Sequence, residues 1–212
     1  MRFKDRTDAG LQLAAKLSWL RDKSDVIILA IPRGGVIVAD VIAKSLNATL
    51  DVVIPRKLGA PNNPELAIGA VMHDGSSYIN EYVMTVLRIE NDYVKSETDI
   101  QVREIERRLK LFRGNVVYDL KSKTVVMVDD GIATGATMMV AIAWIKKQNP
   151  NMIILAVPVA PKETVRKLSE IVDETVVLHM PLEFGAVGEF YEDFCQISDD
   201  EVMGILRKYK AQ

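Results

Sequence analysis

The 212-residue sequence has little of what disulfides, zinc centres and membrane spans require. It contains one cysteine, Cys195, and two histidines, so an intrachain disulfide is excluded and a dedicated zinc site is not expected. No apolar run approaches the roughly 20 residues that cross a bilayer. The charged stretch 1–6 also lacks the apolar core of an export signal. We therefore expect a cytoplasmic protein with no membrane partner.

Other patterns are missing as well. The formal net charge is −2, so no general surplus of basic residues is available for nucleic acid, and no nucleic-acid partner is expected. The glycine patterns GxxxxGK[ST] and GxGxxG, which form nucleotide-binding loops, do not occur. Apolar residues nevertheless make up 49% of the chain, enough for a sizeable core. We expect a single domain over 1–212, with a loop and hairpin insertion around 57–115 and a hood segment around 180–212.

Apolar runs alternate with amphipathic segments along the chain, as in proteins that pack helices on a parallel sheet. Short connections between them favour right-handed crossovers and parallel strands. The breaker-rich stretch 58–64 is predicted to be a mobile loop, and residues 66–72 and 78–79 to flank a tight turn at Asp74 and Gly75. We expect strands at 26–31, 51–54, 125–128, 152–159 and 174–178, and helices at 8–20, 36–46, 90–112, 136–147, 161–171 and 199–209.

The most informative stretch runs from the strand at 125–128 through Asp129 and Asp130 into a loop of small and hydroxyl residues. Parallel sheets bind ligands at the carboxyl ends of their strands, where these two acids lie. Carboxylates can accept hydrogen bonds from vicinal sugar hydroxyls, while loop amides and the hydroxyls of Thr134 and Thr137 can donate to a phosphate. The alternative is an ordinary turn in which an acid caps a helix. That reading accounts for one acid but not two, and not for both threonines.

This combination resembles the signature of type I phosphoribosyltransferases, enzymes that bind 5-phosphoribosyl-1-pyrophosphate (PRPP). The resemblance implies an α/β fold, a parallel twisted sheet flanked by helices, with a small subdomain that carries a hood and a flexible loop. It also implies that Asp129 and Asp130 act in catalysis and hold Mg²⁺ directly or through water. The ribose 5-phosphate would bind a loop made of Ala133, Thr134, Gly135, Ala136 and Thr137.

At two positions the sequence differs from members of that family. Gly131 stands where the family usually has an apolar residue, so its backbone is expected to be more flexible or to adopt a positive φ. Ala133 stands where the 6-oxopurine enzymes have a carboxylate that interacts with the base. Salvage of hypoxanthine or guanine by that route is therefore not expected.

A second glycine-containing turn, made of Pro32, Arg33, Gly34 and Gly35, lies between a strand and a helix. Its small residues allow backbone amides to face an anion at the start of the helix. The turn resembles the pyrophosphate-binding loop of the same family, which implies that Arg33, Gly34 and Gly35 bind pyrophosphate. An ordinary connection between strand and helix is the alternative.

Arg56 and Lys57 end the next predicted strand. In related enzymes basic residues here contact the pyrophosphate, so the resemblance implies a catalytic role for both. The loop at 58–64 then resembles the mobile loop that closes over PRPP and excludes water from the reacting sugar. Without the rest of the pattern, a solvated loop start would explain both side chains.

The aromatic stretch 183–194 is where we expect the specificity for the acceptor, because family members build a hood over the base. An aromatic face could hold a planar base. Phe190, Tyr191 and Phe194 lie at helical spacing, however, and such residues more often pack in a core. Core packing is the interpretation we favour for these three side chains.

The sequence thus predicts a Mg²⁺-dependent phosphoribosyltransferase that moves the phosphoribosyl group of PRPP to a nitrogenous acceptor, a nucleobase, and releases pyrophosphate. The alternative is a regulatory protein that binds PRPP with little or no transfer, which the lack of a visible nucleic-acid surface disfavours. A pyrophosphokinase that makes PRPP fits poorly because no ATP site is evident. A homodimer is expected from the habit of the family.

Overall fold

The structure is a computed structural model, and it describes residues 2–210. Contacts within the chain group these residues into two compact units. The first contains the residues up to Val53, the stretch Tyr118–Thr134 and the residues from Gln148 onward, and the second contains Ile54–Val117 and Gly135–Lys147. The expectation of one domain with an insertion near 57–115 and a hood segment near 180–212 stays a prediction.

The first unit is built on a five-stranded parallel sheet in the order β2-β1-β6-β7-β8. The strands are β1 (Val26–Ala30), β2 (Thr49–Val52), β6 (Thr124–Val128), β7 (Met152–Val159) and β8 (Glu174–His179). The prediction of a parallel sheet is confirmed. The chain leaves β1 for β2 on one side and later returns to pair β6 on its other side, so the strand order reverses next to β1. Ligands of such sheets bind at this point, beyond the carboxyl ends of the strands.

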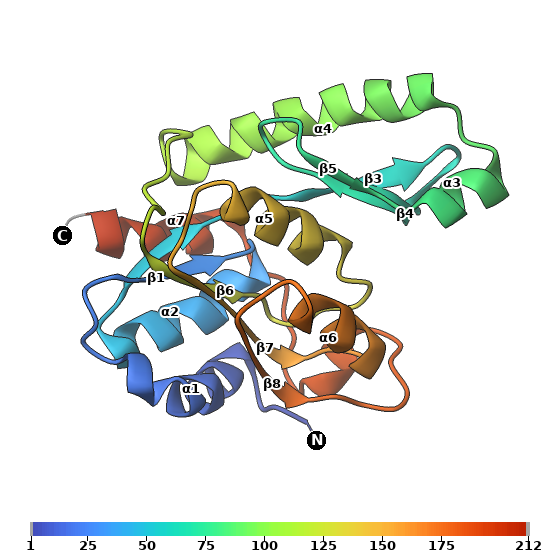
Figure 1. Cartoon of the computed structure of the whole chain (residues 1–212). Coiled ribbons are helices and arrows are strands. Elements are labelled where there is room, and N and C mark those ends of the chain that lie inside the picture. The colour runs from blue at the N-terminus through green and yellow to red at the C-terminus, as the bar shows by residue number, and fades with distance from the viewer. Residues whose placement is uncertain (1, 211–212) are drawn as a thin grey trace. The chain divides into compact units, whose positions relative to one another are not determined.

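Helices flank this sheet. Helices α1 (Arg6–Lys16) and α2 (Gly34–Leu46) pack against one another (Figure 1). Helix α1 contacts β7 and β8, and α2 contacts β1, β2 and β6. Helix α1 begins two residues before the predicted start because Asp5 caps it and accepts a hydrogen bond from the Asp8 amide. The unit also contains α6 (Lys162–Ser169), α7 (Asp199–Lys210) and two 3₁₀ turns, Ser18–Leu20 and Val187–Phe190.

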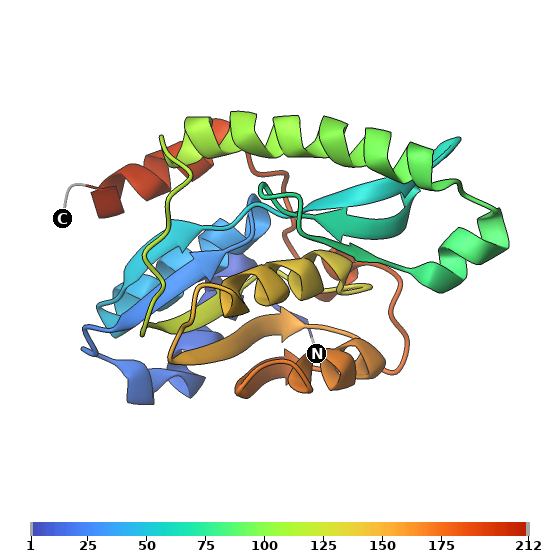
Figure 2. The ribbon, with the colours of Figure 1, turned by 45° about the horizontal axis from the view of Figure 1, so that its top comes forward.

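The second unit contains a three-stranded antiparallel sheet, β3 (Arg56–Ala60), β4 (Asn63–Val71) and β5 (Ser77–Ile79), with helices α3 (Glu81–Leu87), α4 (Asn91–Phe112) and α5 (Ala136–Lys146). The long helix α4 runs along this sheet (Figure 2). The hairpin around Asp74 and Gly75 is confirmed. The loop predicted at 58–64 is wrong as to its structure, because this stretch forms most of a β3–β4 hairpin, while its mobility stays a prediction. Leu58 is fully buried there, and Asn62 takes the turn with a φ of 64°.

No helix within residues 2–210 combines the length and the apolar character needed to cross a bilayer.

Candidate functional site

The first unit brings the acidic pair and the glycine turn together. Asp129 and Asp130 follow β6, and Gly34 and Gly35 open α2 just after β1. The Ile31 amide donates to the Val128 carbonyl at 2.9 Å, so the two strands stay paired up to the point where both loops begin. Two loops predicted to bind different parts of one ligand therefore start side by side.

The two glycines are needed because the acids lie against the start of α2. A Cβ on Gly34 would lie 1.8 Å from Oδ2 of Asp130, and a Cβ on Gly35 would lie 2.9 Å from Cα of Asp129. No larger residue fits either place without moving the acidic pair. The peptide bond between Pro32 and Arg33, immediately before these glycines, is cis.

Arg6, the first residue of α1, holds Asp130. Its Nε donates to Oδ2 of Asp130 at 2.7 Å, and one terminal nitrogen donates to the Cys195 carbonyl at 2.9 Å. The guanidinium also lies 3.8 Å from the centre of the Phe194 ring, a distance typical of a cation–π contact. Sequence reasoning missed Arg6, because nothing local marks an arginine 124 residues before its partner.

Tyr191 supports the same acid from the opposite end of the sequence. Its side chain is 1% exposed, and its hydroxyl donates to the Asp130 carbonyl at 2.6 Å. Burial, together with the carboxylate of Asp130, raises the pKa of Tyr191 far above its usual range, so the hydroxyl stays protonated as a donor. The backbone of Asp130 is thereby fixed as firmly as its side chain.

The aromatic residues of the stretch 183–194 mostly pack as a core. Phe190 and Phe184 stack at 5.3 Å between ring centres and pack, with Tyr191, around Phe3 and Val159. Core packing, the interpretation favoured from the sequence, is therefore confirmed for Phe190 and Tyr191.

Phe194 differs from these two residues, since it is 37% exposed and carries the Arg6 guanidinium on its face. With Arg33 and Gly34, the segment 194–197 lines a hollow of about 300 Å³, into which Arg6 also faces. Arg33 contacts Asp199 at 3.8 Å, and both side chains are more than a third exposed.

Two adjacent carboxyl groups, largely shielded from water, are unfavourable in their charged forms. Burial and the adjacent Asp130 raise the pKa of Asp129 well above its usual range. Burial also raises the pKa of Asp130, although Arg6 opposes the rise. Bound hydroxyl donors or a cation would relieve both acids.

This donor set fits Mg²⁺, which takes one or two carboxylates and completes its shell with water and substrate oxygens. It does not make an all-protein metal cage. No cluster of three or more His, Cys, Asp or Glu residues suited to a metal occurs in the part of the chain that the structure describes.

Gly131 is small for a reason other than the one expected. It is absent from the residues with positive φ, so a positive φ at this position is wrong, and the alternative of a more flexible backbone stays a prediction. A Cβ at this position would lie 2.4 Å from a methyl carbon of Val187 and 3.0 Å from one of Val159. The glycine lets the stretch after β6 pass directly beneath the 3₁₀ turn Val187–Phe190.

The predicted phosphate loop lies on chain that passes from the first unit to the second. Ala133 and Thr134 end the stretch in the first unit, where both are exposed and the Ala133 carbonyl accepts from the Thr164 hydroxyl at 2.8 Å. In the second unit Gly135, with a φ of 82°, precedes α5, whose first turn contains Ala136 and Thr137. No side chain caps this helix start within the described residues, so its first amides are available to an anion.

Arg56 and Lys57 lie on β3 in the second unit. Arg56 donates to the side chain of Gln101 and lies 4.0 Å from Glu104, both on α4, and it is half-buried. Burial and the neighbouring Arg108 lower its pKa. Lys57 is exposed. Of the two predicted pyrophosphate ligands, Arg56 is thus already engaged within its own unit.

The chain is similar to a known protein family and to curated proteins. The chain matches the phosphoribosyl transferase domain family over residues 5–188. Two curated proteins of Mycobacterium tuberculosis, which carry the provisional name phosphoribosyl transferase, are each 43% identical over 205 residues, or 96% of this chain. The match covers 46% of each of them, so the chain spans about half the length of these relatives.

Solved structures agree with this match. The protein TT1426 of Thermus thermophilus is 39% identical, with a TM-score of 0.79 and 99% of both chains covered. A purine phosphoribosyltransferase of Pyrococcus horikoshii shares the fold at 20% identity, with a TM-score of 0.50 and 93% of this chain and 97% of that one covered. The paired strand ends, the acids and the family match all point the same way: this chain belongs to the phosphoribosyl transferase domain family.

Proposed function

We propose that this protein is a Mg²⁺-dependent phosphoribosyltransferase that transfers the 5-phosphoribosyl group of PRPP to a nitrogenous acceptor, a nucleobase. The observation that carries the proposal is the partly buried pair Asp129 and Asp130 at the carboxyl end of β6, held against the glycine start of α2. Family membership agrees with this use of the pair.

In this proposal both acids accept hydrogen bonds from the sugar hydroxyls or bind Mg²⁺. Arg6 occupies Oδ2 of Asp130, and the Asp130 amide donates to Oδ1 of Asp129 at 2.8 Å. Each carboxylate has a further oxygen for a ribose hydroxyl or for Mg²⁺. When bound, Mg²⁺ would add positive charge where the pyrophosphate leaves.

Donors near these acids would hold the leaving group. The amides of Gly34 and Gly35 start a 13-residue helix, whose positive dipole end favours anions. The partly exposed guanidinium of Arg33, which also contacts Asp199, adds positive charge to the same turn. Lys57, in the second unit, is proposed as a further pyrophosphate ligand from the resemblance to the family, and its exposed ammonium is less engaged than the Arg56 guanidinium.

The 5-phosphate is proposed to bind the loop from Ala133 to Thr137, whose exposed Thr134 and uncapped helix start supply donors. In the reaction the bond between ribose C1 and the pyrophosphate oxygen breaks, and a bond from C1 to the acceptor nitrogen forms. Pyrophosphate leaves with the bonding electrons, and the proton of the acceptor nitrogen passes to solvent. Catalysis is then positional and electrostatic, without a covalent enzyme intermediate.

The test is calorimetric titration of PRPP with and without Mg²⁺, followed by a panel of nucleobases monitored for release of pyrophosphate. Mg²⁺-dependent binding with release by one base supports the transferase and identifies the acceptor. Binding without release from any base moves the assignment to a PRPP-binding regulator. Failure of PRPP to bind would overturn the proposal.

The control for this experiment is a variant that removes both charges. Asp129→Asn with Asp130→Asn should abolish Mg²⁺-dependent PRPP binding while thermal unfolding stays cooperative. The matched variant Glu163→Gln, on the exposed face of α6, should bind as the wild type does. Unchanged affinity in the double variant would mean that PRPP binds elsewhere.

A further inference from the structure

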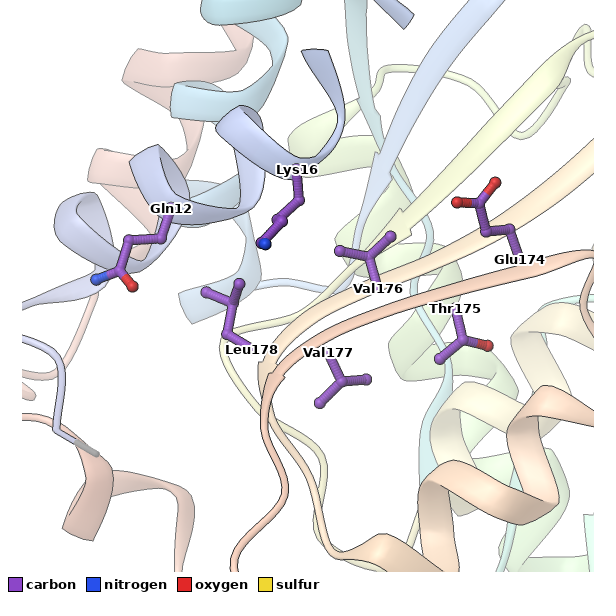
Figure 3. Close-up of a pocket in the computed structure, with 7 residues that line it drawn as sticks. All are labelled: Gln12, Lys16, Glu174, Thr175, Val176, Val177 and Leu178. Carbon is purple, nitrogen blue, oxygen red and sulfur yellow. The ribbon is translucent and has the colours of Figure 1, made fainter. Parts of the chain in front are cut away.

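The hollows of the first unit differ in which residues line them. One hollow, of about 530 Å³, is lined by α1 and β8 (Figure 3). Its lining residues, none of which belongs to a predicted ligand-binding loop, are Gln12, Lys16 and 174–178. The hollow at Phe194 is lined instead by Arg33 and Gly34 of the glycine turn and by Arg6. Phe194 thus lies, 37% exposed, beside residues that are predicted to bind the ligand or that hold the acidic pair.

The hydrogen bonds of Arg6 restrain its guanidinium mainly within its own plane. Nε donates to Oδ2 of Asp130, and a terminal nitrogen donates to the Cys195 carbonyl. Because the N–H groups of a guanidinium lie in its plane, these bonds fix directions within the plane and resist a tilt out of it much less. The Phe194 ring, whose centre lies 3.8 Å from Cζ of Arg6, packs against the guanidinium and opposes that tilt.

The ring of Phe194 is held by its own neighbours. It lies 5.0 Å from the Tyr191 ring, with 31° between the two planes. Gly188 leaves room for it, because a Cβ at that position would lie 2.9 Å from Cδ1 of Phe194. The backbone just before the ring is tied to the start of the chain, since the Asp193 amide donates to the Lys4 carbonyl at 2.9 Å. The ring can therefore act as a fixed support for a longer and more flexible side chain.

Core packing and a direct contact with the acceptor explain this arrangement less well. A core residue is buried like Tyr191, which is 1% exposed, whereas more than a third of Phe194 is exposed. A ring that stacks on a planar acceptor needs a face free of protein groups. The Phe194 ring already carries the Arg6 guanidinium and lies next to the Tyr191 ring.

We infer that Phe194 is a positioning residue for the proposed transfer, because its ring holds the Arg6 guanidinium in the orientation in which Nε meets Oδ2 of Asp130. The inference rests on the proposed function, in which Asp130 contacts the sugar or Mg²⁺. Without the ring, Arg6 keeps its charge and its reach but samples more orientations, and Asp130 moves with it. PRPP then has to order both side chains when it binds, which weakens its binding.

The first test is calorimetric titration of PRPP in the presence of Mg²⁺ and without any acceptor. Phe194→Leu keeps an apolar side chain but removes the ring face, so the PRPP dissociation constant should rise about fivefold or more, as for a partly desolvated cation–π contact. Phe194→Tyr keeps the ring face and should bind as the wild type does. Gly188→Ala keeps Phe194 but pushes its ring, and it should also weaken binding. The matched control Trp19→Leu removes an exposed stack, in which Nζ of Lys23 lies 4.8 Å from the ring centre, and should leave binding unchanged.

Combination with Arg6→Ala distinguishes a positioning role from a direct contact with the ligand. If Phe194 acts through Arg6, Phe194→Leu should cause little further loss of PRPP affinity once Arg6 is alanine. Losses that add in full would overturn the inference, because the ring would then act on the ligand by itself. If the wild type binds PRPP and Phe194→Leu binds it equally well, the role of Phe194 fails and the proposed function stands. If the wild type binds no PRPP, both fail.

A second measurement follows Arg6 without any ligand. Arg6 and Asp130 are 9% and 15% exposed, so the Nε proton of Arg6 should exchange slowly with water in nitrogen-15 NMR spectra. Its resonance is assigned by its absence from spectra of Arg6→Ala. Phe194→Leu should speed this exchange by about tenfold or more through freer local opening, and Trp19→Leu should not. Unchanged exchange in Phe194→Leu would overturn the inference even if PRPP binding fell, because the ring would then not hold Arg6.

Discussion

Replacing Arg6 with alanine tests how the acidic pair is held. The guanidinium and the Asp130 carboxylate are 9% and 15% exposed, so their ion pair is largely shielded from water. Removing one partner of a buried pair costs about 3–5 kcal/mol. Asp130 can take up a proton once Arg6 is gone, because burial already raises its pKa, so we expect the lower end of this range.

A loss of about 3 kcal/mol corresponds to a fall in Tm of roughly 6–12 °C, at 2–4 °C per kcal/mol for a chain of this size. Thermal and denaturant unfolding of Arg6→Ala, Asp130→Ala and the double variant measure the pair directly through a double-mutant cycle. The matched control is Lys167→Ala, which breaks the exposed pair of α6 with Glu163 and should leave stability unchanged.

The same variants separate stability from ligand binding. Arg6→Lys keeps the charge but loses the planar stack on Phe194 and the second donor, so its PRPP affinity should lie between those of the wild type and Arg6→Ala. A coupling energy below about 0.5 kcal/mol would refute the reasoning, because the pair would then contribute no more than an exposed one.

Three further predictions use other features. Gly34→Ala should displace the acidic pair, lower the free energy of unfolding by about 1–3 kcal/mol and weaken PRPP binding. The control Gly204→Ala, on an open face of α7, should make the protein more stable. Unfolding curves measure the stability of both variants, and calorimetry measures their PRPP binding. Asp129→Asn should raise the free energy of unfolding at pH 7 by on the order of 1 kcal/mol, seen as a higher Tm, since it removes a charge whose pKa is raised by desolvation. That gain should shrink as the pH falls through the raised pKa, and a lower Tm at pH 7 would contradict it. Hydrogen bonds from Arg107 and Arg108 lower the pKa of Glu104 to about 2. The wild type should therefore be more stable than Glu104→Gln above pH 4.5, and this difference should disappear as the pH falls toward 2. Acid unfolding of both proteins measures the difference.

Local patterns predicted the parallel core well. The strand at 152–159 has the expected bounds, and the helix expected at 90–112 lies within one residue of α4. Buried strands and long amphipathic helices have strong periodicity, so neighbouring residues alone identify them. The predictions for the acidic pair and the glycine turn rest on another local signal, because each is a short contiguous motif next to a strand.

The errors come from contacts between distant residues. Breaker residues at 58–64 indicated a loop, yet pairing with β4 made the stretch a hairpin, with Leu58 buried. Gly131 indicated backbone freedom, whereas its reason is Val187, 56 positions along the chain. Arg6 belongs to no local sequence motif, and only the fold brings its guanidinium into contact with the Asp130 carboxylate.

The way Asp130 is held has a consequence for synthesis on the ribosome. Arg6 joins the acid to the Cys195 carbonyl, 189 residues later in the sequence, and the Phe3 amide donates to the Phe190 carbonyl in the same region. A nascent chain can complete β1, β6 and both glycine turns long before Tyr191 leaves the exit tunnel. Until then Asp130 lacks its hydroxyl support, and Arg6 lacks the carbonyl and ring that orient it. The acidic pair and the glycine turns are thus translated early, and their final geometry forms only when the last sheet strand and the residues after it have emerged.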